Sequence, residues 1–411
     1  QHTEETATGQ LRSFRFRVDN PPISTMETVG AIRGEELALE THANGKVDTK
    51  TSKWDPDTRS PAWQDRDLQE HPLQPGETRS FEMYDPELNQ VVTITVTENG
   101  NATTTLLDGT EIDARRIVMT HSAIPFLSLT SYMNVDGEVV KSESNILQVV
   151  TYTVDRETAL REIDDQPVDL AVETLVQVKP IEQAHDRTRI VYRIKVSGGD
   201  AAAQFPNGPT QQSQRISDSE AEVTVTALAA DAAPVADAET PEPRYLSATR
   251  FLDSNNPLVI RHSQSAAASD MAPAAAARAM EQYVHDTMRD RNFATGLATA
   301  SEVADKLEGD CTEHAVLLAA MLRARKIPAR VAVGLVYSQQ HAAFAGHMWT
   351  EAWLDGRWTP LDATLGRGGI GAAHIKLADS ALDEDAPTPI AAFLPMIHLL
   401  GEMEIEVVSA E

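Results

Sequence analysis

Apolar and polar residues alternate along much of the first part of the chain, which is the pattern of half-buried β-strands. Residues 91–97, Val-Val-Thr-Ile-Thr-Val-Thr, follow this period of two. The dipeptides Asn99-Gly100, Asp108-Gly109 and Asp136-Gly137 accompany such runs, and pairs of this kind accept the positive φ angles of tight hairpin turns. We therefore expect residues 1–155 to form an antiparallel β-rich domain.

Strand-like runs continue beyond this domain, but polar segments separate them. We expect residues 156–228 to form a second small β-domain, with the Gln-, Ser- and Pro-rich segment 202–215 as a loop. Residues 229–244 are rich in Ala, Asp, Glu and Pro, can bury little apolar surface and are predicted to be an acidic linker. Within the first domain, residues 48–78 have a loop-like composition as well. The strand candidates of the second domain are 168–178, 189–196 and 221–228.

Helical spacing appears in residues 245–411. Asp270-Met-Ala-Pro273 combines a capping Asp with a first-turn Pro and predicts the start of a helix. A second helix is predicted to begin near Asp310, because apolar residues recur on one helical face after it. That face carries Cys311, Ala315, Leu318 and Leu322. The strand-like runs after this helix are 330–337, 347–354, 358–361 and 403–408, with a turn predicted at Asp355-Gly356.

The chain is strongly acidic, which narrows the choice of partners. It has 62 Asp and Glu against 35 Lys and Arg, a formal charge of −27. Such a surface repels phosphate backbones and anionic lipid, so we expect no nucleic-acid partner. No run approaches the ~18 apolar residues of a membrane helix, so we expect no membrane insertion. The polar start at Gln1 suggests a mature or trimmed chain, and we expect a periplasmic or secreted protein.

The single cysteine, Cys311, is the main candidate for chemistry. A lone cysteine can be a small buried hydrophobic residue, but this one begins a predicted helix, where the helix dipole favours the thiolate. His347 opens a predicted strand, and Asp362 ends the next hairpin arm. Adjacent antiparallel strands can place these two side chains together, and a carboxylate would then fix the imidazole tautomer.

Three motifs in this order resemble the bacterial transglutaminase-like superfamily. Residues 309–315, Gly-Asp-Cys-Thr-Glu-His-Ala, resemble its nucleophile motif, and residues 346–353, Gly-His-Met-Trp-Thr-Glu-Ala-Trp, resemble its histidine strand. Residues 358–364, Trp-Thr-Pro-Leu-Asp-Ala-Thr, resemble its aspartate motif. The resemblance covers about 245–408. It implies an α+β protein whose C-terminal transglutaminase-like, papain-like catalytic domain (245–411) follows antiparallel β-rich domains.

The resemblance also implies a mechanism. In this family Cys311 would attack an amide carbonyl, His347 would take and return the proton, and Asp362 would orient His347. Water can resolve the resulting thioester, as in a cysteine peptidase or amidase, and a lysine amine can resolve it, as in a protein-glutamine transglutaminase. We expect hydrolysis of a protein or peptide substrate. The alternatives are cross-linking and a non-catalytic binding or scaffold protein with a degenerate domain.

Further residues are candidates for the substrate cleft. They are His314, one helical turn after Cys311, together with Trp349 and Tyr283. The backbone N–H of Cys311 is one expected oxyanion donor, and Tyr283 and Gln282 are side-chain candidates for another. We expect no cofactor and no metal, because structural zinc prefers four Cys or His ligands and no calcium loop motif is present. The sequence carries no signal of an oligomeric state.

Overall fold

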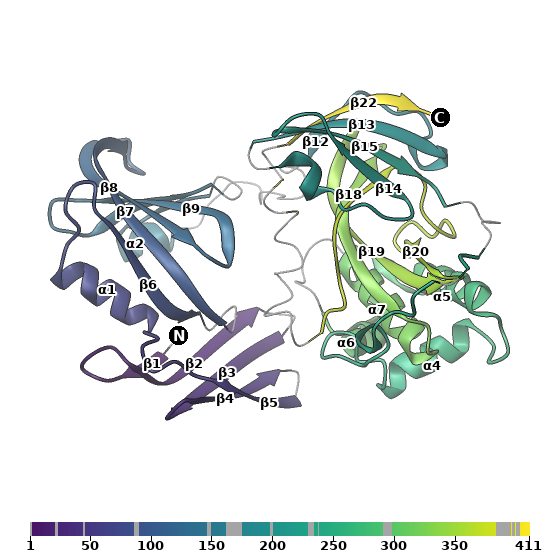
Figure 1. Cartoon of the computed structure of the whole chain (residues 1–411), viewed down its shortest axis with the longest axis horizontal. Helices are drawn as coiled ribbons and strands as arrows, with labels where there is room; N and C mark the ends of the chain where they lie inside the picture. Colours follow the sequence, from purple (N-terminus) through teal and green to yellow (C-terminus); the bar gives the residue numbers. More distant parts are fainter. Residues whose placement is uncertain are drawn as a thin grey trace. The chain divides into compact units, whose positions relative to one another are not determined.

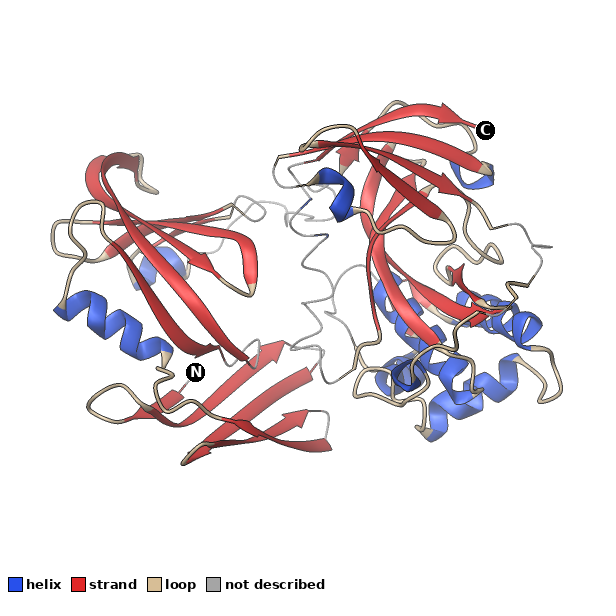
Figure 2. Ribbon diagram, viewed as in Figure 1, coloured by secondary structure: helices blue, strands red, loops and turns tan. Residues whose placement is uncertain are grey.

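The chain divides into two compact units, Gln1–Pro167 and Val168–Glu411. A computed structural model describes residues 2–411 apart from 21–23, 44–45, 86–89, 146–148, 162–174, 198–199, 229–233, 237, 291–297, 384–395, 397–398 and 400–402. The architecture is mixed α+β, as the sequence predicts. Figure 2 shows strands in both units, with the long helices of the second unit gathered in one region.

The first unit contains two antiparallel meanders (Figure 1). Both meanders follow the order of the chain, because each strand pairs with the next one through a short connection. One sheet comprises β1 (His2–Glu5), β2 (Leu11–Asn20), β3 (Ser24–Arg33), β4 (Glu36–Ala43) and β5 (Lys46–Lys53). The other comprises β6 (Thr78–Asp85), β7 (Gln90–Thr105), β8 (Glu111–His121), β9 (Ile124–Met133), β10 (Val139–Ser144) and β11 (Val150–Tyr152). The described helices of the first unit are α1 (Pro61–Glu70) and α2 (Arg156–Ala159).

Two expectations for this unit were wrong. Asn99-Gly100 does not turn a hairpin: it lies inside β7, where the register with β8 shifts between Glu98 and Asn101, and Gly100 takes the positive φ of +76°. The positive φ of Gly100 therefore serves a β-bulge within the strand and not a hairpin turn. Residues 48–78 are not one long loop, because they contain most of β5 and all of α1. Ser60 caps α1 by accepting a hydrogen bond from Trp63 N, and Pro61 occupies the first turn.

The second unit combines two sheets with a layer of helices. The larger sheet has the order β12–β19–β18–β21, with β20 also pairing with β19, and the smaller has the order β14–β15–β13–β22. The strands are β12 (Val176–Gln177), β13 (Arg189–Val196), β14 (Gln211–Arg215), β15 (Glu220–Thr226), β18 (Ala329–Ser338), β19 (Ala343–Leu354), β20 (Arg357–Leu361), β21 (His374–Ser380) and β22 (Met403–Ala410). A short parallel pair joins β16 (Arg289–Asp290) to β17 (Glu308–Gly309).

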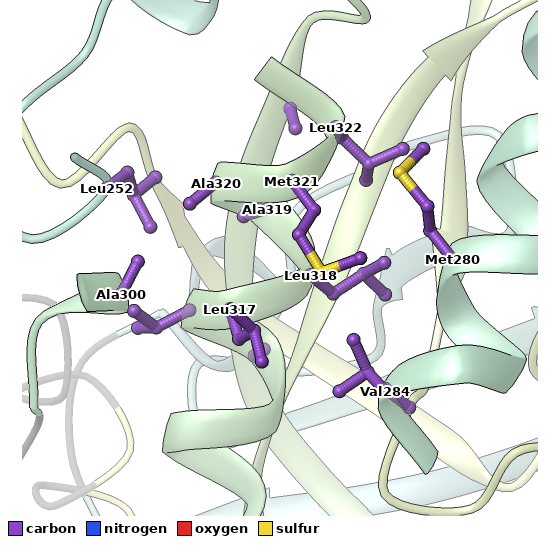
Figure 3. Packing of buried hydrophobic residues seen from close by; sticks show 14 of the residues in the cluster. Leu252, Met280, Val284, Ala300, Leu317, Leu318, Ala319, Ala320, Met321 and Leu322 are labelled. Atoms are coloured by element: carbon purple, nitrogen blue, oxygen red, sulfur yellow. The ribbon is translucent and has the colours of Figure 1, made fainter. Parts of the chain in front are cut away.

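One long buried helix lies between the larger sheet and the other helices of the second unit. The described helices of this unit are α4 (Pro257–Ala266), α5 (Pro273–Thr287), α6 (Ala300–Lys306) and the buried α7 (Cys311–Ala324), with 3₁₀ turns η1 (Ala184–Asp186), η2 (Ala201–Gln204) and η3 (Pro243–Tyr245). Residues 313–323 of α7 are all buried, because helices cover it on one side and β18 and β19 on the other. Figure 3 shows Met280 and Val284 of α5 on one side of α7 and Leu252 and Ala300 on the other. This packing holds the start of α7 in place.

The segment expected to be a separate small β-domain shares a sheet with the end of the chain. Strand β13 lies between β15 and β22, with Ile194 opposite Ile405. The Gln211 side chain of β14 also exchanges two hydrogen bonds with the backbone of Lys376 in β21, at 2.8 and 2.9 Å. The loop expected at 202–215 contains η2 and β14. The boundaries at 155, 228 and 244 stay predictions about folding units.

Parts of two expectations lie outside the described residues. They are positions 168–174 of a strand candidate and positions 229–233 and 237 of the acidic linker. Within the linker, Val235 N donates a hydrogen bond to the Asp355 carbonyl oxygen at the β19–β20 turn. Among the helices that the structure describes, none has the length and apolar character that crossing a membrane requires.

Candidate active site

Cys311 is the first residue of α7, and its surroundings fix it there. Asp310 is the N-cap and accepts a hydrogen bond of 2.8 Å from Thr312 N. Buried Glu313 completes a capping box by accepting from Asp310 N. A Cβ on Gly309 would lie 2.3 Å from Glu313 Cβ, so only glycine fits before the cap. Cys311 is a partly exposed residue that packs against the helix core, and it lies at the positive end of a buried helix.

His347 connects the cysteine to a carboxylate. It lies in the middle of β19, opposite Gly334 of β18. Its Nε2 donates to Asp362 Oδ2 over 2.9 Å, and the Cys311 side chain is close enough to act on its charge. Burial disfavours the imidazolium, but the charges of Asp362 and Cys311 outweigh burial and raise the pKa of His347 to about 10. His347 is therefore a charged donor between sulfur and carboxylate at neutral pH.

Asp362 is fully buried directly after β20. Burial by itself raises the pKa of a carboxyl, but His347 and then His374 stabilise the anion and hold the pKa of Asp362 well below its usual range. Its other oxygen, Oδ1, accepts from Thr364 N at 2.9 Å and Leu365 N at 3.3 Å. These bonds fix the carboxylate in one orientation. The structure thus brings together the three residues that the sequence predicted would meet.

His374 is the site residue that the sequence reasoning missed. It lies in β21, and its Nε2 is 3.0 Å from the same Asp362 Oδ2 that His347 contacts. Burial lowers the pKa of His374, so it is neutral and donates its single N–H to Asp362. Its Nδ1 is buried without a hydrogen-bond partner, as expected of a lone pair in that tautomer. The alternation of His-Ile-Lys-Leu in 374–377 is a strand signal that could have pointed to this residue.

The same three side chains form a group that could hold a metal. Ligand atoms of His347, Asp362 and His374 lie within 4.8 Å of one another, and all three residues are buried. Two imidazoles and a carboxylate suit zinc or a similar ion. Both nitrogens, however, lie at hydrogen-bond distance from a single oxygen, and two N–H donors sharing one anion account for that geometry.

The expected cleft residues have different surroundings. Trp349 is buried beside the site, with its ring 6.3 Å from that of His347 and 5.5 Å from that of His374. His314 is buried, and its Nδ1 lies 2.7 Å from the Asp310 carbonyl oxygen. Tyr283 lies among the helices and its hydroxyl bonds to His262 Nδ1 at 2.9 Å. Trp349 therefore packs against the catalytic candidates, whereas the polar atoms of His314 and Tyr283 are used elsewhere.

The two side chains expected as oxyanion donors also have other hydrogen-bond partners. Gln282 donates to Asp286 on the exposed face of α5 over 2.8 Å, and Tyr283 is bonded to His262. The backbone N–H of Cys311 lies in the first turn of α7, where N–H groups have no partner within the helix. It remains the expected donor.

Comparison with known protein families gives one match. Residues 260–363 match the core model of the transglutaminase-like superfamily. This part of the chain is a transglutaminase-like domain. The match contains Cys311, His347 and Asp362, whereas His374 lies beyond its end. No curated protein matches the chain.

Two solved structures show a distant likeness. One is a proposed cysteine protease from Cytophaga hutchinsonii, with 15% identity, a TM-score of 0.33, and coverage of 54% of this chain and 88% of that one. The other is a proposed protease from Parabacteroides distasonis ATCC 8503, with 12% identity, a TM-score of 0.22, and coverage of 83% of this chain and 64% of that one. These scores are too low to support an inference about function, so the case depends on the residues of the transglutaminase-like domain.

A buried acid supports the aspartate loop of this domain. Glu281 of α5 is fully buried, and its Oε1 accepts from Asp362 N at 2.9 Å and Gly369 N at 3.1 Å. Burial raises the pKa of Glu281 to about 7. The folded protein therefore binds this proton more tightly than the unfolded chain. The stabilisation is complete below about pH 4.5 and is lost as the pH rises through about 7.

The variant Glu281→Gln is expected to weaken this pH dependence. Glutamine keeps the accepting oxygen and has no charge, so the variant gains roughly 2 kcal/mol of unfolding free energy relative to the wild type between pH 5 and pH 8. Urea unfolding at both pH values measures the change. Glu182→Gln, at an exposed carboxylate, is the matched control and should follow the wild type. If Glu281→Gln also follows the wild type, Glu281 is ionised at both pH values.

His374 is expected to act as a positioning residue through its N–H. His374→Phe fills most of the space without a donor, and we expect it to slow alkylation of Cys311 by iodoacetamide at pH 6 by about tenfold, because one of the four N–H groups that fix Asp362 is lost. His374→Gln supplies a new N–H donor and should recover most of the rate. Melting temperatures are measured alongside. Equal rates for both variants would mean that His374 only fills space.

Proposed function

We propose that this protein catalyses thiol-dependent amide-bond chemistry on protein or peptide substrates, with hydrolysis as its main reaction. One observation carries the proposal: His347 donates to the buried Asp362 carboxylate and is close enough to the Cys311 side chain for the two to interact electrostatically. A nucleophile, a base and a group that orients the base are the recurring parts of such sites. Cys311 is partly exposed as a residue, which supports access of a substrate to the site.

The proposed reaction has two stages. The Cys311 sulfur forms a bond with the amide carbonyl carbon. The carbonyl oxygen becomes an oxyanion, which accepts a hydrogen bond from the backbone N–H of Cys311. The C–N bond then breaks, and the amine leaves with a proton from His347. In the second stage His347 takes a proton from water, the oxygen attacks the thioester, and the carboxylic acid leaves as the C–S bond breaks. Asp362 keeps the imidazole oriented throughout.

Cross-linking uses the same first stage, so one experiment must distinguish the outcomes. The full chain is incubated with a denatured, glutamine-containing protein and a fluorescent primary amine, beside the Cys311→Ala variant. Cys311-dependent cleavage of the protein is the expected result. Cys311-dependent incorporation of the amine would select the transglutaminase reaction. If neither occurs with any of a panel of proteins, and Cys311 labels no faster than a free thiol, the chain is a binding or scaffold protein.

The proposal also includes a protein or peptide substrate, no nucleic-acid partner, and a periplasmic or secreted location. The formal charge of −27 supports the exclusion of nucleic acid. Fractionation of the producing cells tests the location, because an enzyme of the cytoplasm would be found only in the soluble intracellular fraction.

A further inference from the structure

A cavity of about 290 Å³ lies next to the loop that follows Asp362. Residues from four parts of the second unit line it: η1 with the two residues before β13, the chain after β15, the first turns of α5, and the β19–β20 hairpin with the glycine-rich segment 367–371. Neither Cys311 nor His347 belongs to the lining. The cavity is therefore distinct from the candidate catalytic residues, although Pro360 and Leu361 lead from it directly to Asp362.

The lining is positively charged in a chain that is otherwise acidic. Its charged residues are four arginines, Arg187, Arg278, Arg357 and Arg367, and two aspartates, Asp186 and Asp355. These give the cavity wall a formal excess of two positive charges, whereas the whole chain carries −27. Guanidinium groups that converge on a concave site are the usual means of holding carboxylate or phosphate.

Backbone contacts hold parts of this wall in place. Arg187 Nε donates to the Glu182 carbonyl oxygen at 2.9 Å, and the Arg187 carbonyl oxygen accepts from Ala372 N at 3.1 Å. Arg367 forms an ion pair with Asp186. That pair links the glycine-rich segment to η1, and both of its side chains remain about half exposed, at 45% and 58%. An incoming anion can therefore reach Arg367 and compete with Asp186.

We propose that this cavity binds an oxyanion, a carboxylate or phosphate group, with Arg367 and the other arginines of its wall as ligands. The volume suits a small organic anion or the acidic end of a peptide. Bound there, the anion lies on the loop whose first residue is Asp362 and whose Gly369 N donates to Glu281. The site therefore adjoins the catalytic loop without using the catalytic residues.

Binding is tested on the full chain by isothermal titration calorimetry with three probes: inorganic phosphate, succinate, and a short peptide ending in two glutamates. All solutions are matched in ionic strength with NaCl, since salt alone screens an acidic protein. We expect saturable binding of at least one probe with a Kd on the order of 1 mM or tighter. Binding of phosphate or succinate identifies a free anion as sufficient, and binding of the peptide alone identifies a peptide carboxylate as the ligand.

Variants connect the binding to the cavity. The double variant Arg357→Gln/Arg367→Gln is expected to weaken binding at least about tenfold, and Asp186→Asn to strengthen it about threefold because a competing carboxylate is removed. Arg261→Gln, at an exposed position of α4, has the same charge change as one cavity substitution and should bind like the wild type. The proposal is overturned if no probe binds below about 10 mM, or if the double variant and Arg261→Gln bind equally well.

Discussion

Replacing Cys311 with alanine is expected to lower the turnover of a peptide substrate by at least about 10⁴-fold, to the level left by binding and oxyanion contacts alone. No other cysteine exists in the chain to substitute for it. Its position at the first turn of α7 lets alanine replace it without loss of the cap, because Asp310 and Glu313 make the capping bonds. The melting temperature should therefore stay close to that of the wild type.

Two histidine variants accompany this experiment, one inside the candidate site and one outside it. His347→Ala should reduce turnover about as much as Cys311→Ala, since residues that act as one unit show non-additive losses. His341→Ala removes an imidazole from an exposed loop, where His341 Nδ1 bonds to Ser338 Oγ at 3.0 Å, and should leave turnover unchanged. If the Cys311→Ala variant keeps more than about a tenth of the activity, the sulfur is not the nucleophile and the proposed function fails.

Loss of the Asp362 charge is expected to reduce turnover by about 10³-fold and to change how Cys311 responds to pH. In the wild type, Asp362 and Cys311 raise the pKa of His347 to about 10 against the effect of burial. In Asp362→Asn burial prevails, so His347 loses its proton at lower pH and no longer supports the thiolate. Iodoacetamide should then label Cys311 at least about 100-fold more slowly at pH 6, with the rate recovering only in alkaline solution as for a simple thiol.

The asparagine variant is preferred to alanine because Asp362 also supports its loop. Its Oδ1 accepts from Thr364 N and Leu365 N, and asparagine can keep an oxygen there. Asp305→Asn, at an exposed position of α6, removes the same charge outside both the candidate site and the arginine-lined cavity. It should match the wild type in labelling and turnover. Fast labelling of Asp362→Asn at pH 6 would mean that Asp362 does not control the imidazolium.

Local patterns gave a good prediction of the elements that carry the candidate site in the second unit. The apolar spacing after Asp310 predicted α7, and Asp355-Gly356 predicted the hairpin between β19 and β20. These elements have strong local signals, because a helix buried on all sides and a tight turn each require particular residues. The small β-domain expected at 156–228 shows the limit of local reading. Its strand β13 pairs with β22, over 200 residues later, and local patterns contain no information about such a pairing.

The sequence by itself determined the chemistry available to this protein: one cysteine at the start of a capped helix, with His347 on a strand and Asp362 at the end of the next strand, in motifs that resemble a known superfamily. Only the tertiary structure decided what surrounds them. His374 reaches Asp362 from β21, Glu281 reaches the same loop from α5, and the arginine-lined cavity combines four separate segments. Hydrogen bonds and charges act between neighbours in space, and the neighbours in this unit come from parts of the chain that no periodicity connects.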